Sequence, residues 1–385
     1  PIYLDYGATT PLDERVWEAM LPYFQQQFGN PASVHQFGQQ AEFALENARR
    51  SLAERLGAHP DQIIFTSGAT ESDNLALRGT AFAERSKRNA NHILVSSVEH
   101  DAIANTARQL AELHGFEVER IPVDKFGQVQ PESLSARLRE DTAVVSIIMA
   151  SNEVGTVNPI RNLAAICRDS GVPLHSDAVQ AAAYLPIDVQ ELGVDMLSLG
   201  AHKFYGPKGM GLLYLRDHNL LSPIQTGGSH EFQLRAGTQN TPYIVGMAKA
   251  YELLYDEIID RHAKLAILRD QVIEGVLASI SEAQLSGHPN ERLPNHASFI
   301  FRGIDGNALL MHLDQGGFAC SSGSACKTGN PEPSEVLLAL GLQREWALGS
   351  LRVTVGIHTS REDIERFLEF LPQAIEKSRV TEITA

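Results

Sequence analysis

Short apolar runs alternate with longer amphipathic segments through the first two thirds of the chain. The apolar runs are rich in Val, Ile and Leu, and the intervening segments repeat their apolar positions at helical spacing. Strand and helix in alternation indicate βα units and a mostly parallel sheet. The pattern predicts strands at 62–66, 93–96, 118–121, 143–149, 172–176, 196–199 and 211–215, and helices at 41–56, 71–83, 102–114 and 162–170.

The last third of the chain has a different pattern. A long helical run covers 241–279, and Pro242 fits its first turn. A polar stretch at 286–294 follows, and then short segments that predict a mixture of strands and helices at 297–301, 308–313, 333–340, 351–355 and 361–376. We expect a large α/β domain over 12–255 and a smaller α+β domain built from 1–11 and 256–385. A cleft between them is the expected ligand site.

Composition narrows the class of protein. The 385 residues are 43% hydrophobic and 21% charged, with a formal net charge of −15. An acidic surface argues against nucleic acid or an anionic membrane as the main partner. Three cysteines cannot form a disulfide framework and suit a reducing compartment. Neither a secretion signal nor an apolar run long enough for a membrane span is visible, so we expect a cytoplasmic protein.

Two polar motifs follow predicted strands. The first, TSGATESDN at 66–74, opens a helix, and backbone N–H groups at a helix start attract phosphate; an ordinary helix cap is the alternative. The second, HSDAVQ at 175–180, places Asp177 where open α/β sheets bind ligands. A solvated turn residue is the alternative reading for Asp177.

Two further motifs carry groups that can take part in acid–base or imine chemistry. GAHKFYGPKG at 200–209 encloses Lys203, and desolvation there would leave the neutral amine that forms Schiff bases. Lys208 is the competing lysine. His100 ends a strand and could stack on a planar ligand or shuttle a proton, although a lone histidine is more often structural. Together with a phosphate site and Asp177, these groups match the needs of pyridoxal phosphate (PLP).

The chain resembles the cysteine desulfurases of the nitrogen-fixation and iron–sulfur-assembly type, which are fold-type I PLP enzymes. The resemblance covers essentially the whole chain. It rests on long ordered motifs: LDYGATTP, GNPASVH, SGATESDN, SNEVGTVNPI, AHKFYGPKG, LRAGTQNTP, SSGSAC, PEPSEVLLALG and LRVTVG.

The resemblance implies a role for each matching residue. Lys203 would bind PLP and later move the Cα proton, His100 would stack on the ring, Asp177 would pair with the ring nitrogen and Gln180 would contact the ring hydroxyl. Further cofactor contacts are implied for Ala69, Thr70, His202 and Asn152, and for Thr238 toward the other subunit of a homodimer. Substrate contacts are implied for Arg352, Asn152, Asn30 and His35.

Three positions depart from the family pattern. Gly200 stands where many relatives have a serine that binds phosphate, Gln239 stands where glutamate is common, and 228–234 replaces a run richer in glycine and glutamine. Because of these departures, we expect the local geometry near the phosphate and the dimer contact to differ from that of relatives. The departures do not change the predicted class of reaction.

Two of the three cysteines lie in one loop, at about 319–334, among Ser, Gly and Pro. Residues alone leave open whether those thiols are incidental or functional. The resemblance maps the nucleophile that takes sulfur from L-cysteine to Cys326, and the small residues around it would permit motion. Cys320 is expected to be an apolar residue at a strand end, with a resolving or regulatory thiol as the alternative, and Cys167 is expected to lie buried in a helix.

The resemblance implies that L-cysteine is converted to L-alanine, with a persulfide left on Cys326 for an acceptor such as an iron–sulfur scaffold protein. A metal site is not expected, since no close-spaced Cys or His pairs occur. The rival hypotheses are a selenocysteine lyase or other PLP-dependent lyase on the same fold, and a sulfur carrier without catalytic activity.

Overall fold

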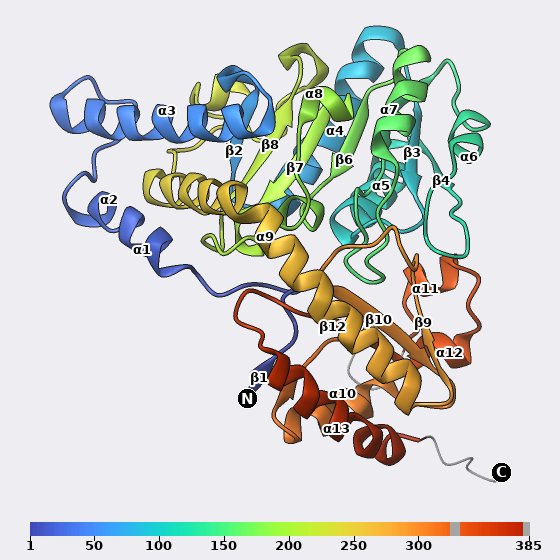
Figure 1. Ribbon diagram of the computed structural model, residues 1–385. Helices are drawn as coiled ribbons and strands as arrows, with labels where there is room; N and C mark the ends of the chain where they lie inside the picture. The colour runs from blue at the N-terminus through green and yellow to red at the C-terminus, as the bar shows by residue number, and fades with distance from the viewer. Residues whose placement is uncertain (324–331, 380–385) are drawn as a thin grey trace.

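The computed structural model describes residues 1–323 and 332–379, and it is built around a seven-stranded sheet (Figure 1). The strands lie in the order β2-β8-β7-β6-β5-β3-β4. Only β8 is antiparallel to its neighbours within this sheet, so the prediction of a mostly parallel sheet is confirmed. The strands are β2 (Ile63–Thr66), β3 (His92–Ser96), β4 (Glu117–Ile121), β5 (Thr142–Ser146), β6 (Leu174–Asp177), β7 (Met196–Gly200) and β8 (Gly211–Leu215).

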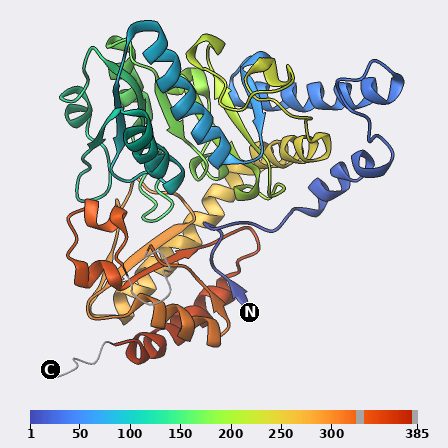
Figure 2. The same ribbon diagram turned by 180° about the vertical axis from the view of Figure 1, so that it is seen from behind.

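Helices cover both faces of this sheet. Successive strand residues point to opposite faces, and Ile93 and Val144 accordingly pack in one core cluster while Leu94 and Val145 pack in another. The first cluster includes residues of α4 (Ala69–Arg88) and α5 (Asp101–His114), which lie over the sheet when it is seen from behind (Figure 2). The second includes residues of α3 (Gln36–Leu56), α7 (Ile160–Asp169) and α9 (Thr241–Ser279). The helices that precede α9 are α1 (Glu14–Met20), α2 (Pro22–Gln25), α3 (Gln36–Leu56), α4 (Ala69–Arg88), α5 (Asp101–His114), α6 (Pro131–Ser135), α7 (Ile160–Asp169) and α8 (Val189–Leu192).

Helix α9 (Thr241–Ser279) links the large sheet to a smaller set of elements (Figure 1). Its bounds agree with the prediction, and the predicted domain boundary at 255 falls inside this continuous helix. Three strands of this smaller set form an antiparallel sheet in the order β12-β10-β9. The whole set comprises β9 (Ala283–Leu285), β10 (His296–Phe301), α10 (Gly306–Gln315), α11 (Glu335–Ala339), α12 (Arg344–Leu348), β12 (Ser350–Thr354) and α13 (Arg361–Lys377).

The N-terminal strand joins this smaller region. Strand β1 (Ile2–Tyr3) pairs in parallel with β11 (Phe318–Ala319), which no local pattern predicted. Cys320 follows β11 directly and packs on the core, as expected, and Cys167 is fully buried in α7. Along 1–323 and 332–379, every helix is too short or too polar to cross a lipid bilayer.

One predicted strand extended too far. The stretch 143–149 is strand only to Ser146 in β5, and the following backbone leaves regular pairing. Ile147 and Met149 still donate their N–H groups to the carbonyls of His175 and Asp177, at 3.1 and 2.8 Å. This irregular continuation keeps the segment that leads to Asn152 beside the end of β6.

Candidate active site

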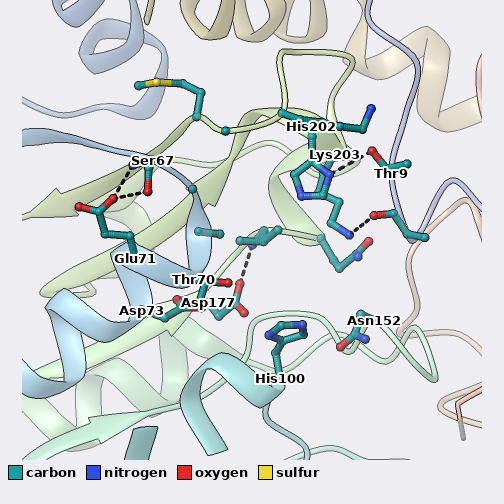
Figure 3. A pocket seen from close by; sticks show the side chains of 18 of the residues that line it. Thr9, Ser67, Thr70, Glu71, Asp73, His100, Asn152, Asp177, His202 and Lys203 are labelled. Carbon is teal, nitrogen blue, oxygen red and sulfur yellow. Dashed lines mark hydrogen bonds between the residues drawn. The ribbon is translucent and has the colours of Figure 1, made fainter. Parts of the chain in front are cut away.

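A cavity of about 620 Å³ opens where β6 and β7 end and α4 begins. Carboxyl ends of parallel strands and helix N-termini meet there, which is the usual ligand position in open α/β sheets. Figure 3 shows side chains from several elements pointing into this space. The predicted residues that line it are Ala69, Thr70, His100, Asn152, Asp177, Gln180, His202 and Lys203.

Lys203 enters the cavity from the turn that follows β7. Its Nζ donates to the backbone carbonyls of Gly7 and Ala8, both at 2.7 Å. Burial first, and then the charge of Arg352, lower the pKa of Lys203 to about 8, while Asp177 opposes part of the shift. A lysine held by neutral carbonyls with this pKa has a substantial neutral fraction near pH 7, as imine formation requires.

Asp177 is the last residue of β6, and its buried carboxylate faces the same cavity. The N–H of Val179 donates to Oδ1 at 2.9 Å and fixes the side chain. Burial raises the pKa of Asp177, while His100 and Lys203 lower it. Such a carboxylate is suited to pairing with a positively charged group in the cavity.

His100 is exposed to the cavity and also caps α5. Its Nδ1 accepts a hydrogen bond from the N–H of Ala102 at 3.1 Å. Because Nδ1 accepts, the neutral ring carries its proton on Nε2. The ring is therefore held at the helix start with a defined tautomer.

The start of α4 forms one wall of the cavity. Ala69 and Thr70 belong to the first turn, where no preceding turn supplies acceptors for the N–H groups. Glu71 turns back to accept from the N–H of Ser67 at 2.7 Å, and Arg235 pairs with Glu71 at 2.7 Å. Glu71 is therefore engaged by Ser67 and Arg235, and the N–H groups at the start of α4 remain able to bind an anion.

Glycine permits the close packing behind this helix start. A Cβ at Gly211, the first residue of β8, would lie 2.6 Å from the carbonyl carbon of Gly68. A Cβ at Gly200, at the end of β7, would meet the Cβ of Ala69 at 3.3 Å. The family departure at Gly200 therefore falls against the start of α4, beside the predicted phosphate site.

One contact of His202 and one of Gln180 complete the cavity wall. The Nδ1 of His202 lies 3.1 Å from the Oγ1 of Thr9, and burial lowers the pKa of His202 to about 4. Gln180 donates through Nε2 to the carbonyl of Gly7 at 2.8 Å. The N-terminal segment thus supplies acceptors to both Gln180 and Lys203.

Arg352 lies in a second cavity of about 430 Å³, and His100 and Asn152 line both cavities. Its Nη2 pairs with Asp5 at 2.8 Å, and its Nη1 donates to the backbone carbonyl of Asn152 at 2.9 Å. Its buried Nε has no hydrogen-bond partner among the described residues. The guanidinium therefore keeps N–H donors that these two contacts do not use, and Asp5 already neutralises part of its charge.

Three predicted residues lie elsewhere. Thr238 is exposed and lines an adjoining cavity of about 230 Å³. Asn30 accepts from the N–H of Ala32, and His35 caps α3; both are exposed and neither lines the cavity that contains Lys203. Cys326 lies outside the described residues.

Sequence reasoning missed three groups in this region. Asp5 pairs with Arg352, Thr9 contacts His202, and Asp73 lines the main cavity beside Asp177. Asp5 and Asp73 stand inside motifs that the sequence analysis quoted, and Asp73 is one helical turn after Thr70. That spacing placed Asp73 on the same helix face as the predicted phosphate site.

The cavity fits PLP by its own chemistry. It combines a lysine with a lowered pKa, a buried carboxylate opposite it, an exposed histidine ring and a helix N-terminus. These are the imine-forming group, ring-nitrogen partner, ring-face contact and phosphate site that this cofactor needs.

Comparisons with known proteins agree with this geometry. Residues 2–367 match the family described as aminotransferase class-V. The cysteine desulfurase IscS of Dictyoglomus turgidum is 46% identical over 98% of this chain and 95% of its own length, and that of Methanosarcina thermophila is 45% identical over 98% and 93%. A solved structure of a NifS-like protein matches with a TM-score of 0.90 at 35% identity, over 97% of this chain and 99% of its own. The chain belongs to the aminotransferase class-V family.

Proposed function

We infer that this protein is a PLP-dependent cysteine desulfurase, which converts L-cysteine to L-alanine and transfers the sulfur. The observation that carries this inference is the cavity in which the Lys203 amine, with a pKa of about 8, lies with Asp177 and His100. The full-length similarity to proteins named cysteine desulfurase supports the reaction.

PLP, when bound, would serve as the electron sink for the electron pair released with the substrate's Cα proton. Lys203 would bind it, Asp177 would face its ring nitrogen and Gln180 its ring hydroxyl, and His100 would lie on the ring face. Ala69 and Thr70, at the start of α4, and His202 would hold the phosphate. Their positions around one cavity support these roles.

Lys203 would also move the proton. When it is free of the cofactor, its neutral Nζ would be a base that can take the proton from Cα and return it later. The carbonyls of Gly7 and Ala8 accept from Nζ and can hold it when it is charged. The same side chain thus binds the cofactor and carries the proton.

Arg352 would orient the substrate by its carboxylate, with Asn152 beside it. The unpaired Nε and the position of Arg352 next to His100 and Asn152 support this role. A guanidinium suits a carboxylate because its planar donors can bind both oxygens.

Cys326 would take the sulfur. Its thiolate attacks the sulfur of L-cysteine, the Cβ–S bond breaks, and its electron pair stays with the carbon that becomes the methyl group of L-alanine. That carbon takes up the proton that Cys326 gave up when it became a thiolate, and Cys326 keeps the sulfur as a persulfide, so atoms and electrons balance. Gly323 and Glu332, the described residues on either side of this segment, both line the cavity that contains Arg352, which supports the assignment.

A second copy of the chain is the proposed partner in a homodimer. Large apolar side chains on and around α1 to α3 are exposed, which marks an interaction surface: Trp17, Leu21, Phe24, Phe28, Val34, Phe37 and Phe43. Asn30 and His35 lie in this stretch of the chain. We propose that Thr238 reaches the phosphate of the other copy, and that Asn30 and His35 contribute to the site only across the dimer.

The proposed acceptor of sulfur is a protein such as an iron–sulfur scaffold. The free thiols of Cys167 and Cys320 suit a reducing compartment, and we propose the cytoplasm. A selenocysteine lyase is the second candidate, because the same cavity would accept the selenium analogue. Turnover of the two amino acids in one assay separates the candidates.

The test compares L-alanine formation from L-cysteine and a reductant by the wild type, Cys326→Ser and Cys320→Ser. Burial raises the pKa of the Cys320 thiol, so this cysteine is the matched control. We expect alanine from the wild type and Cys320→Ser and none above background from Cys326→Ser. Equal alanine from Cys326→Ser would mean that sulfur leaves without this thiol, and a lyase would replace the desulfurase.

A further inference from the structure

Asp73 is a fully buried carboxyl group for which the proposed reaction has no use. It lies one turn into α4, and its side chain is 1% exposed. Its Oδ1 has no hydrogen-bond partner among the described residues. A buried ionised carboxylate without strong partners is costly, so its charge state needs an explanation.

Asp73 lies beside the carboxylate proposed to pair with the cofactor ring. A carboxylate oxygen of Asp73, one of Asp177 and a ring nitrogen of His100 all lie within 4.8 Å of one another. Figure 3 shows Asp73 behind Asp177 at the edge of the cavity. Two negative charges this close in a buried site strongly disfavour each other, so one carboxyl group keeps a proton.

The surroundings of the two carboxyl groups are unequal. Asp177 accepts from the N–H of Val179, and its interactions with His100 and Lys203 favour the charged form of its carboxyl group. The groups that face Asp73 are the carboxyl groups of Asp177 and Glu99, the hydroxyl of Ser198, the ring of His175 and, from the cavity side, a ring nitrogen of His100.

Among the described residues on the side of Asp73 away from the cavity, the basic group is His175, and it carries no compensating charge. His175 is itself fully buried, its Nε2 lies 3.6 Å from Oδ1 of Asp73, and burial lowers its pKa to about 3, so its ring is neutral. Burial and the neighbouring carboxylates hold the pKa of Asp73 well above its usual range. The proton of the pair therefore belongs on Asp73.

A series of buried hydrogen-bonded side chains can accept the hydrogen bond that this proton provides. The hydroxyls of Ser146 and Ser198 lie 2.9 Å from the two ring nitrogens of His175, and Ser198 also bonds Asp73. A neutral carboxylic acid supplies the O–H donor that a carboxylate lacks. The series then extends from β5 through β6 and β7 to α4 without a buried charge.

We propose that Asp73 is a positioning residue that stays a neutral carboxylic acid, so that the carboxyl pair presents one negative charge, on Asp177, to the cofactor ring. This inference rests on the proposed function, because it gives Asp177 a ring nitrogen to face. What position 73 contributes is a neutral hydrogen-bonding group of the right shape, and not a charge.

The test makes the same isosteric change at the two carboxyl groups. Asp73→Asn and Asp177→Asn are prepared free of cofactor, and PLP affinity and the pH dependence of the bound cofactor's absorption are measured for each. We expect the PLP affinity of Asp73→Asn to stay within about threefold of wild type, and that of Asp177→Asn to fall at least about tenfold. Only the second substitution removes a negative charge, and a tenfold change in affinity corresponds to a shift of about one pKa unit. Asp73→Ser, a smaller neutral residue, serves if Asp73→Asn does not fold.

Infrared difference spectra of the cofactor-free protein give a second readout. Wild type minus Asp73→Asn should show the carbonyl stretch of a protonated carboxyl group from pH 6 to pH 8. Its absence, or a spectral and affinity change in Asp73→Asn as large as that in Asp177→Asn, would overturn the inference. If neither variant alters cofactor binding while the infrared band is present, the proposed function of this cavity fails and the neutral state of Asp73 stands.

Discussion

The lowered pKa of Lys203 predicts a reactivity that can be measured without cofactor or substrate. Its amine has a pKa of about 8, against 10.5 for an ordinary lysine, because burial disfavours the charged ammonium. At pH 7 the neutral fraction rises from about 0.03% to about 10%, a factor of roughly 300. The neutral amine is the nucleophile, so this factor is the expected rate advantage per accessible lysine.

Reductive methylation of the cofactor-free protein measures this reactivity at single residues. Formaldehyde and a mild hydride donor are applied from pH 6 to pH 10.5, and the labelled peptides are quantified by mass spectrometry. Labelling of Lys203 should reach half its maximum near pH 8. Lys208, which is exposed and only five residues away, is the internal control for access and reagent.

Two variants test the sign of the contribution that each neighbouring charge makes to the pKa of Lys203. The carboxylate of Asp177 raises the pKa of Lys203, so Asp177→Asn should move the half-point to lower pH. The charge of Arg352 lowers it, so Arg352→Met should move the half-point to higher pH. A wild-type half-point above about pH 9.5, close to the reference lysine, or a shift of both variants in one direction, would refute the reasoning.

Three further predictions concern substrate binding and stability. Arg352→Gln should raise the KM for L-cysteine about thirtyfold, since a hydrogen bond to a charged group contributes about 2 kcal/mol, and steady-state kinetics measures this. Glu231→Gln should lower the free energy of unfolding by about 3 kcal/mol or more, because it leaves Arg49 buried without its 2.9 Å ion pair, and Arg49→Met in the same chain should restore part of the loss in denaturant titrations. Burial raises the pKa of Glu99 from 4.5 to about 8, so its contribution to stability is fully present below pH 4.5 and is lost as pH rises to about 8; Glu99→Gln should therefore remove up to roughly 4 kcal/mol of pH dependence in that window.

Each of these predictions has a clear contrary result. Unchanged KM in Arg352→Gln would mean that another group binds the substrate carboxylate. Additive losses for Glu231→Gln and Arg49→Met would mean that the two side chains are not energetically coupled. Parallel pH–stability curves for Glu99→Gln and the wild type would mean that Glu99 is ionised in the folded protein.

Local patterns determined most of the fold. Strand residues such as Val144 and Val145 are apolar on both faces because helices cover both sides of a parallel sheet, and that gives uninterrupted apolar runs. The pattern over α9 was strong enough to predict where the helix begins and approximately where it ends. The start of α4 and the turn that carries Lys203 were also readable, because small residues beside a strand end are a local signal.

Tertiary structure decided which groups act on one another. Lys203 is held by the carbonyl of Gly7, 196 residues earlier, and Arg352 is paired with Asp5, 347 residues earlier. Sequence periodicity reports which face of its own element a residue occupies, and it carries no information on which distant residue lies opposite. Those partners follow from the strand order and from the pairing of β1 with β11, which brings the N-terminal segment across the site.

The charge states of the site have the same origin. The sequence contains Asp73, Asp177 and Lys203, and from the residue types alone one would expect two anions and a cation at neutral pH. Burial and mutual distance reverse that expectation for Asp73 and weaken it for Lys203, because the cost of a buried charge depends on what surrounds it in space. The sequence thus determined which chemical groups are present, and the fold decided which of them carry a charge.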